Sequence, residues 1–569
     1  MPDFPVIFAA GLVPVDYVVI FVYMLGMLAV GWYISRRQET SAEFFVGGRK
    51  MPWFITGVSM IATLMSTITY LGAPGEMIQH GIGQSLSFLA LPFAFLVVGF
   101  LWVPFFMRLR LTSAYEYLER RFGTGARMLG ISLYLWMRFL WMGVIIFTAS
   151  RAVAQITEDS APQAIGTLTG GLVEFTPTSW FYFVLLSTGI FSTLYTMLGG
   201  IKAVIWTDVA QFAVLFTGAV ATLFFVAANT GTGPVTWFRE VTSEAHKLPP
   251  LATWDLHTRV TILWTVIAGF MWHVCTHASD QVCLQRYFAT KNAKAARRTA
   301  AVNYCLDVTM QLLLATVGAA LLTYYLRHGT ELPPGISDPR DVQADKIFPW
   351  FIAHGLPVGL SGLVVAALFA VAQSSIDSGI NSTATVITVD LVRRFRKTQQ
   401  TGHAELRLAQ GLTLILGLVI TAMGVALSLI PPKYNIIDIQ FKSFNCVLGP
   451  LAAMFMAGML LKHVGQRAVV IAGCIGAASG LLFAFMDLIP GWLWSVSFLQ
   501  PFLTTFSETA PVVVAPTPFL IIPLSWLITF VLAAVLGGFL PGPRPEQVEG
   551  LTWRSVVRDE NHDFAPGEA

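Results

Sequence analysis

The sequence predicts an all-helical polytopic membrane protein. Of its 569 residues, 55% are hydrophobic and only 12% are charged, against about 25% charged residues in soluble proteins. The mean hydropathy is +0.66, and apolar segments of about 20 residues, the length that spans a bilayer as a helix, recur along the chain. The net charge of +3 is small. We therefore expect the lipid bilayer as a partner, and neither nucleic acid nor an obligate protein partner.

We expect thirteen membrane-spanning helices. They lie near residues 15–35, 53–79, 84–107, 128–156, 179–198, 202–227, 258–284, 299–326, 357–390, 405–430, 436–461, 467–490 and 518–540. The connections rich in Lys and Arg alternate with poorer ones, as at Arg36/Arg37, Arg120/Arg121 and Arg393/Arg394. Basic connections face the cytoplasm, so the N-terminus lies outside and the C-terminus inside. We predict an integral protein of the plasma (inner) membrane.

The two ends of the chain differ in composition from the spans. The first residues have no basic region and no clear cleavage site, so we expect no cleaved signal peptide. The tail over residues 541–569 is polar and rich in Pro and Glu. That composition predicts a disordered cytoplasmic tail.

Two spans carry signals of a break in the helix. The second contains a polar run over Thr63–Thr69, followed by Gly-Ala-Pro-Gly at Gly72–Gly75, and the seventh has a polar interruption over Trp272–Gln281. Discontinuous helices at matching positions of two inverted five-helix repeats mark a midplane binding site in secondary transporters. The alternative is a pair of ordinary kinked helices whose Ser and Thr side chains bond their own backbone.

A stripe of hydroxyl groups runs along the segment Phe369–Asp390, which lies within the ninth predicted span. On a helical wheel at ~100° per residue, Ser378 lies roughly 40° from Ser374, and Asn381 and Thr385 lie closer still. Polar groups inside a membrane must face protein or water. Oxygen ligands without thiols or imidazoles suit a hard cation. The stripe therefore predicts an ion-coordinating helix.

Other chemistry finds less support. His273 and His277 have the spacing of a zinc-binding pair, but there is no accompanying glutamate motif and no second cluster. We therefore expect no transition metal. No nucleophile–base constellation occurs outside the polar stripe, so we expect no enzyme.

Six segments together resemble the sodium/solute symporter family. They are Tyr195–Gln211 (YTMLGGIKAVIWTDVAQ), Phe44–Lys50 (FFVGGRK), Thr112–Phe122 (TSAYEYLERRF), Asp280–Tyr287 (DQVCLQRY), Ser374–Thr385 and Leu448–Pro450. The family includes sodium-coupled carriers of sugars, proline, iodide, vitamins, monocarboxylates and sialic acid. The resemblance implies a LeuT-type transport core of ten helices over residues 36–465. An extra helix would precede it in 1–35, and two would follow in 466–540.

The resemblance also implies Na⁺ as the coupling ion, with one or two ions per cycle. The first sodium site would use backbone or hydroxyl oxygens of Ala62, Met65, Val371, Ser374 and Ser375. A second would use Asp208, Ser374, Asp377 and Ser378. Relatives usually carry Ser or Thr where this chain has Asp377, so this carboxylate either strengthens cation binding or carries a proton. Asp208 alternatively pairs with a nearby lysine or hydroxyl as a structural carboxylate.

The same resemblance places the transported solute beside the ions. The implied contacts are Ser66, Thr69, His273, Thr276, His277, Gln281, Phe441 and Asn445. Relatives that carry sialic acid use an arginine that aligns with Met142. Arg138, one turn away, either substitutes for it in binding an anion or is a positive charge near the cytoplasmic end of its helix. The stretch Met60–Gly75 looks closest to the iodide, vitamin and monocarboxylate branch, which favours an organic anion or a sugar-like solute. A proton-coupled symporter and a solute-binding sensor (transceptor) are the alternatives.

Overall fold

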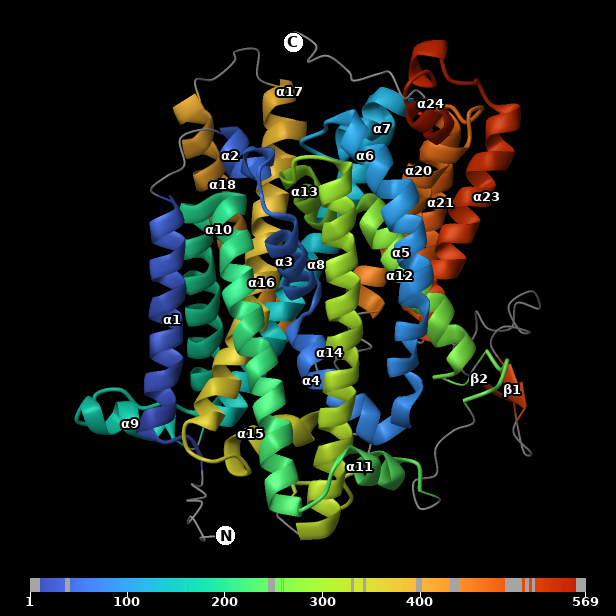
Figure 1. Ribbon diagram of the computed structural model, residues 1–569. Coiled ribbons are helices and arrows are strands. Elements are labelled where there is room, and N and C mark those ends of the chain that lie inside the picture. Colours follow the sequence, from blue (N-terminus) through green and yellow to red (C-terminus); the bar gives the residue numbers. More distant parts are fainter. Residues whose placement is uncertain are drawn as a thin grey trace.

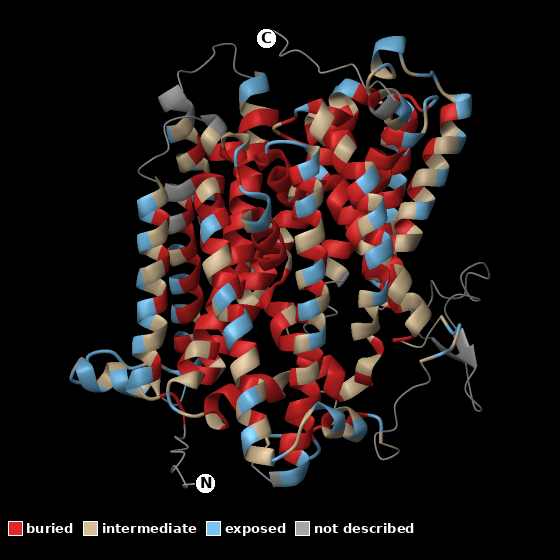
Figure 2. Ribbon diagram, viewed as in Figure 1, coloured by how far each residue is buried: buried red, intermediate tan, exposed pale blue. Residues whose placement is uncertain are grey.

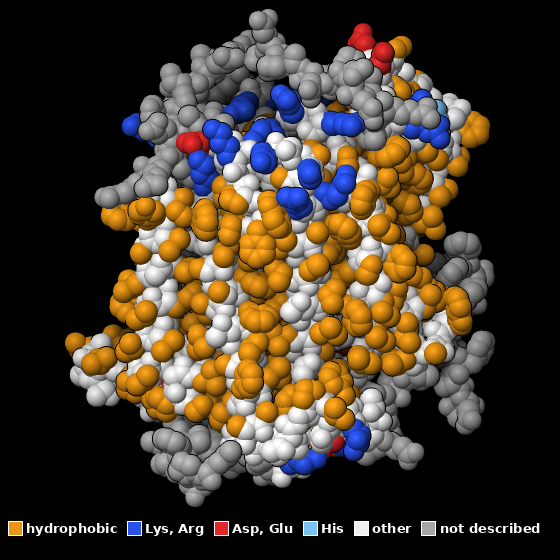
Figure 3. All heavy atoms as spheres, in the orientation of Figure 1, with side chains coloured by type: hydrophobic (Ala, Val, Ile, Leu, Met, Phe, Trp, Pro, Cys, Tyr) orange, Lys and Arg blue, Asp and Glu red, His pale blue; other side chains and the backbone are white. Residues whose placement is uncertain are grey.

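Long helices run side by side across the molecule and present an apolar band to the outside (Figures 1 and 3). The computed structural model describes residues 11–35, 41–158, 160–243, 251–256, 258, 260–328, 332–340, 344–395, 402–429, 441–486, 504–506, 511–513 and 517–558. Within these ranges nine helices are long and apolar enough to cross a membrane, or ten if one bent pair is a single span. A polytopic helical architecture is confirmed, and the count of thirteen stays a prediction.

The regular elements described in the N-terminal part of the chain are all helices. Its elements are α1 (Pro14–Ser35), α2 (Ser41–Val46), η1 (Gly47–Arg49), α3 (Trp53–Leu64), α4 (Thr67–His80), η2 (Gly81–Gly83), η3 (Ser85–Ala90), α5 (Leu91–Val97), η4 (Val98–Trp102), α6 (Val103–Leu109), α7 (Tyr115–Phe122), α8 (Thr124–Thr157), α9 (Ala161–Leu168), α10 (Pro177–Thr230) and α11 (Pro234–Val241).

The C-terminal part adds one short antiparallel strand pair to its helices. Its elements are α12 (Ile262–Ser279), α13 (Gln281–Ala289), α14 (Ala293–His328), η5 (Ala344–Lys346), α15 (Ile347–His354), α16 (Leu360–Val386), η6 (Ile387–Val392), α17 (Arg393–Phe395), α18 (Gly402–Ser428), η7 (Phe441–Asn445), α20 (Cys446–Leu460), α21 (Gln466–Ala484), β1 (Thr504–Phe506), β2 (Pro511–Val513), η10 (Pro518–Leu520), α23 (Ile521–Phe539), η11 (Pro545–Gln547) and α24 (Trp553–Arg558).

The break predicted in the second span is present. Helices α3 and α4 meet at an angle of 66°, because Met65 and Ser66 both have extended backbones with ψ of 125° and 168°. The last carbonyls of α3 thereby lose the amide partners that a continuous helix would supply. The seventh predicted span also breaks, at Asp280, whose side chain accepts a hydrogen bond from Val282 N and starts α13.

A kink rather than a loop separates the fifth and sixth predicted spans. Gly200 lies inside α10 with φ of 51° and ψ of −169°. Only glycine adopts this backbone without strain. The chain therefore changes direction at this single residue, and helix continues on both sides of it.

Helix α16 lies at the centre of the bundle (Figures 1 and 2). In its most apolar stretch 94% of the residues are buried, so its polar stripe faces protein and not lipid. Helix α1 is tied to it at two heights. The Asp16 carboxylate accepts hydrogen bonds from Gly359 N (2.7 Å) and Gly362 N (2.8 Å), at the start of α16, and the Tyr23 hydroxyl donates to Gln373 Oε1 (2.9 Å).

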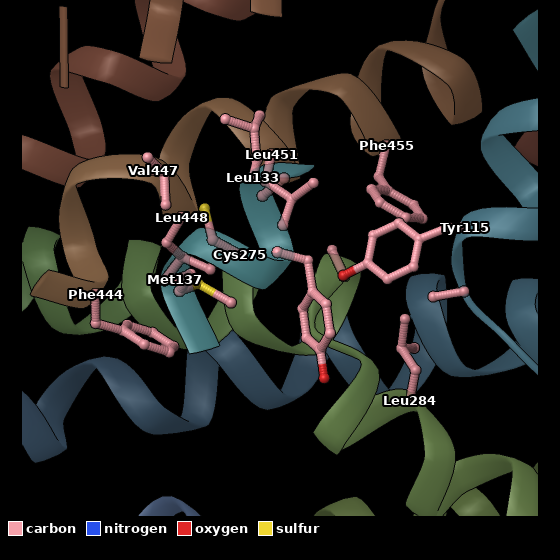
Figure 4. Packing of buried hydrophobic residues seen from close by; sticks show 14 of the residues in the cluster. Tyr115, Leu133, Met137, Cys275, Leu284, Phe444, Val447, Leu448, Leu451 and Phe455 are labelled. Atoms are coloured by element: carbon pink, nitrogen blue, oxygen red, sulfur yellow. The ribbon is translucent and has the colours of Figure 1, made fainter. Parts of the chain in front are cut away.

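The C-terminal helices pack on the core through α20 and α8. Figure 4 shows Leu448 and Leu451 of α20 beside Leu133 and Met137 of α8, and all four belong to one buried hydrophobic cluster. The ring of Phe455 completes this contact, 5.8 Å from the ring of Tyr115.

The chain after residue 540 differs from the expectation of disorder. Helices η11 and α24 lie in it, and residues 559–569 fall outside the described part. The Leu551 carbonyl accepts a hydrogen bond from the Tyr117 hydroxyl (3.1 Å), and Trp553 Nε1 donates to Leu101 O (3.3 Å). Apolar and hydrogen-bonding side chains scattered among the polar ones are enough to hold this segment to the bundle.

Candidate functional site

The break between α3 and α4 meets the hydroxyl stripe of α16. The Ser374 hydroxyl donates to the carbonyl oxygens of Ala62 (2.8 Å) and Val371 (3.1 Å). The Ser375 hydroxyl donates to the carbonyl oxygens of Thr63 (2.9 Å) and Met65 (3.0 Å). The structure therefore brings together all five residues predicted for the first sodium site, and adds the carbonyl of Thr63.

Sequence reasoning missed Thr63, although the signal was present. Its carbonyl lies in the last turn of α3, where the break removes amide partners from the carbonyls after Ile61. Buried carbonyls require a partner, and the two serine hydroxyls supply it. A hydroxyl both donates and accepts, so the same two oxygens can turn their lone pairs toward a cation. Carbonyl and hydroxyl oxygens make a donor set for a hard cation.

A buried arginine lies next to this set. Arg286 of α13 and Asp208 of α10 are both fully buried, and Nη2 lies 2.8 Å from Asp208 Oδ2. The guanidinium also donates to Ser378 Oγ (2.6 Å) and Ser59 Oγ (2.9 Å). Asp208 Oδ2 accepts further bonds from Ser59 (2.5 Å) and Thr63 (3.2 Å). Asp208 and Ser378 therefore share one guanidinium in this structure.

Arg286 was not singled out from the sequence. It lies within the segment Asp280–Tyr287, and its basic charge reads there as the start of a cytoplasmic connection. Only the three-dimensional placement of α13 against α3, α10 and α16 shows that its charge is buried.

Asp377 lies apart from this arginine cluster. Its Oδ1 accepts from Thr196 Oγ1 at 3.1 Å, and in the described part of the chain its Oδ2 has no hydrogen-bond partner. Of the four residues predicted for the second site, Asp208 and Ser378 thus share Arg286, whereas Ser374 and Asp377 bond other groups. Ser374 bonds Ala62, Ser378 bonds Arg286, and Asp377 bonds Thr196.

A cavity of about 190 Å³ lies beside the helix break and shares Met65 with the first site. It is bounded by α3, α4, η3, α12, α14 and η7, with contributions from η10 and α23. Ligand pockets for drug-sized molecules usually measure about 300–1,000 Å³. This cavity suits a smaller solute.

Three of the predicted solute contacts line the cavity, namely Thr69, His273 and Asn445. Ser66, Thr276 and His277 are buried close by in the chain, but they are not among the lining residues. His277 Nδ1 lies 2.7 Å from the Tyr287 hydroxyl. The side chain of Phe441 falls outside the described part.

Gln281 is placed differently from the expectation. Its Oε1 accepts from Ala114 N (2.8 Å), and its Nε2 donates to Thr112 O (2.9 Å). The side chain therefore holds the start of α13 against the turn before α7. It does not reach the cavity.

Two carboxylates of the cavity were missed. Asp307 Oδ2 lies 3.4 Å from His273 Nε2, and Asp307 Oδ1 accepts from Gln311 Nε2 at 2.9 Å. Glu76 lines the cavity from α4, and its carboxylate lies 3.8 Å from His80. A lone carboxylate within an apolar span is a functional candidate by default, and that rule would have found both.

Arg138 is already engaged in the structure. Its guanidinium pairs with the buried Asp280 carboxylate and lies 5.3 Å from the centre of the Phe444 ring. It is not among the residues that line the cavity. The arginine considered for anion binding therefore serves to hold α8 against the break before α13.

Polar networks surround the C-terminal half of α16 and the η6 segment that follows it. Gln285 Nε2 donates to Asn381 Oδ1 (3.1 Å) and Thr385 Oγ1 (3.0 Å). At the end of the helix, Asp390 pairs with Arg127. Burial alone would raise the pKa of the nearby Glu119 carboxyl, but hydrogen bonds from Arg127 and Arg394 lower it below the ordinary value. These contacts tie α16 and η6 to α7, α8 and α13 at the end of the bundle that carries α2 and α17.

Known proteins share both the sequence pattern and the fold. Residues 44–476 match the family model described as the Sodium:solute symporter family. The Sodium/sialic acid symporter SiaT of Proteus mirabilis (strain HI4320) is 28% identical over 462 residues, covering 80% of this chain and 87% of that protein. The Sodium-coupled monocarboxylate transporter 1 of Mus musculus is 29% identical over 486 residues, covering 83% and 72%.

The structural comparison agrees. A solved structure of a Na⁺-coupled sialic acid symporter, in a substrate-bound outward-open state, superposes with a TM-score of 0.74 at 25% identity. The match covers 93% of this chain and 98% of that chain, which establishes a LeuT-like fold. Since the family model spans most of the sequence, the chain belongs to the sodium:solute symporter family and is a sodium-coupled membrane transporter of small solutes, not an enzyme.

Proposed function

We propose that the protein imports a small solute together with Na⁺ by alternating access. The observation that carries this proposal is the contact of Ser374 and Ser375 with the carbonyls of Ala62, Thr63 and Met65. A cation held by these oxygens would tie α3 to α16, next to a cavity lined by Thr69, His273 and Asn445. Ion binding would thereby shape the wall of the solute cavity.

The charge distribution supports the proposed orientation. On the face seen in Figure 3, most Lys and Arg side chains gather at the end that carries α2 and α17, and few occur in the apolar band. Basic residues mark the cytoplasmic side. We propose that this end faces the cytoplasm, with thirteen spans, the N-terminus outside and the plasma (inner) membrane as location. The cavity would then open outward while the cytoplasmic half is sealed.

The ion gradient is sufficient to drive uptake. One charge moved through 100 mV contributes about 2.3 kcal/mol, and a tenfold Na⁺ gradient contributes about 1.4 kcal/mol per ion. With a second ion, the concentration ratio that a neutral solute can reach across the membrane is roughly the square of the ratio reached with one ion. The number of ions therefore sets the accumulation that the cell can reach.

For the second coupling ion we keep two proposals. The first is Na⁺ held by Asp208, Ser374, Asp377 and Ser378. It requires Arg286 to release Ser378, because Asp208 and Ser378 both bond the Arg286 guanidinium. A proton on Asp377 requires no such rearrangement, and the unpartnered Oδ2 of this buried carboxyl supports it. Proton coupling is therefore the second candidate.

Flux into proteoliposomes tests the proposal. Purified full-length protein should accumulate solute against its gradient only when Na⁺ is higher outside. Uptake at an unchanged rate without a Na⁺ gradient would exclude sodium coupling. Binding without flux would instead support a sensor.

A further inference from the structure

We propose that the transported solute carries a positively charged amine, which Asp307 receives in the cavity. This inference rests on the proposed symport function and names its substrate class. It differs from the organic anions that the sequence favoured.

The cavity wall offers negative charge and little to balance it. Among its described lining residues are the carboxylates of Asp307 and Glu76, and neither Lys nor Arg is present. His273 is the lining group that can become positive, and it faces Asp307 at 3.4 Å. Even with His273 protonated, the wall carries no net positive charge.

Among the described wall residues an anionic solute would therefore find no positive side chain except His273, and it would depend on the proposed Na⁺ for a counter-charge. Transfer of an unpaired charge from water into a protein interior is strongly unfavourable. An ammonium group has the opposite balance, since it donates charge-assisted hydrogen bonds to carboxylate oxygens. Arg138 adds no positive charge to this wall, because it is not among the described lining residues and its guanidinium is paired with Asp280.

Two unpartnered acceptors of the wall fit the same chemistry, while the unpartnered Trp272 Nε1 donor calls for an acceptor, such as a hydroxyl oxygen, on the same solute. Gln84 Oε1 and Asn445 Oδ1 are buried acceptors without a hydrogen-bond partner in the described part of the chain. Buried acceptors without partners are uncommon in proteins. A solute rich in N–H and O–H donors would satisfy them. The indole ring of Trp272 also lines the cavity, and an indole face attracts cations.

Two matched sets of probes test the inference with purified full-length protein. Glucosamine, glucose and glucuronate share one ring and differ in charge. The three-carbon compounds 3-amino-1-propanol, 1,3-propanediol and 3-hydroxypropionate share an open chain and differ in charge in the same way. Each is added at saturation in Na⁺ and in K⁺, and the shift of the unfolding temperature is recorded. We expect the largest shift from the amine of at least one set, and only in Na⁺.

Variants assign the effect to the carboxylate. Asp307→Asn should weaken binding of the stabilising amine about tenfold or more, the fold-change expected for loss of a charge-assisted bond. Asp307→Glu should restore most of it. Asp338→Asn, at a carboxylate with 56% exposed side chain in a surface ion pair, is the matched control and should bind as the wild type does. If Asp307→Asn fails to fold, Glu76→Gln replaces it, with a smaller loss expected.

The outcomes separate this inference from the symport function. A larger or equal shift with a neutral or anionic probe in Na⁺, or no shift with either amine, overturns the amine inference and leaves sodium coupling standing. An equal amine shift in Na⁺ and K⁺ contradicts sodium coupling and leaves the substrate class standing.

Discussion

The hydroxyl oxygen of Ser375 lies 2.9 Å from the carbonyl oxygen of Thr63 and 3.0 Å from that of Met65. This one side chain joins the ion-binding helix α16 to the broken end of α3. The hydroxyl of Thr63 continues the connection, since it lies 3.2 Å from Asp208 Oδ2. Thr63 thus contacts the proposed sodium site through its backbone and the buried ion pair through its side chain.

Replacement of Ser375 by Ala should weaken Na⁺ activation. The variant loses one hydroxyl ligand, which corresponds to a roughly tenfold rise in the Na⁺ concentration for half-maximal uptake. Uptake into proteoliposomes at graded Na⁺ measures it. Ser361→Ala is the matched control, since Ser361 is a buried serine near the start of the same helix, far along the chain from the break. Equal Na⁺ activation in both variants would remove Ser375 from the site.

The Arg286–Asp208 pair should be strongly coupled in stability. Asp208→Asn or Arg286→Met alone leaves one buried charge without its partner, at a cost of about 3–5 kcal/mol. The double variant should recover much of this loss. Thermal unfolding of the four proteins in a double-mutant cycle measures the coupling. Additive losses would contradict a direct pair.

The same Asp208→Asn variant tests the second sodium position. If that position holds Na⁺, the Hill coefficient for Na⁺ should fall from about two towards one, because one of two cooperating ions is lost. A wild-type coefficient of about one would exclude occupancy of this position by Na⁺ during transport.

Asp377→Asn distinguishes a proton from a sodium ion at this carboxyl. If Asp377 carries a proton inward, wild-type uptake should rise as external pH falls, since proton supply increases. Asp377→Asn should remove that dependence, and Asp377→Ser, which restores the hydroxyl usual in relatives, should do the same. Asp338→Asn again serves as control. Identical pH profiles for wild type and Asp377→Asn would argue against the proton.

Accessibility of single cysteines should report alternating access. Thr69→Cys lies in the cavity wall, whereas Thr385→Cys lies under Gln285 in the sealed half. In Na⁺, an impermeant thiol reagent should label the first from outside, and cytoplasmic reagent should spare the second. Removal of Na⁺ should expose Thr385→Cys. The background must lack the native cysteines, of which Cys305 and Cys474 are exposed.

The sequence predicts the first ion site better than the solute cavity, for a physical reason. Hydroxyls on one helix face and a broken helix nearby are visible in the order of residues, and the structure brings Ser374 and Ser375 to Ala62 and Met65. The cavity depends on which faces of five or more helices meet. Gln281, on the seventh predicted span, bonds the turn before α7 and does not line the cavity. Asp307, on another helix, lines it instead.

Buried pairing was equally hard to foresee. A lone Asp208 in an apolar span reads as an ion ligand, and a lone Arg286 at a span end reads as a cytoplasmic charge. Each interpretation rests only on the residues that surround Asp208 or Arg286 in the sequence. Their 2.8 Å contact arises because α13 turns back into the bundle after Asp280, which the spacing of residues does not determine.

The double attachment of α1 to α16 offers a spectroscopic handle. Asp16 and Tyr23 hold the two helices together at two heights, and we expect a tilt of α16 to carry α1 with it. Val18 and Val22 on the outer face of α1 are 59% and 61% exposed. A fluorophore placed there would follow the motion of the coupling helix from the lipid side, in a protein whose ion path and cavity remain chemically untouched.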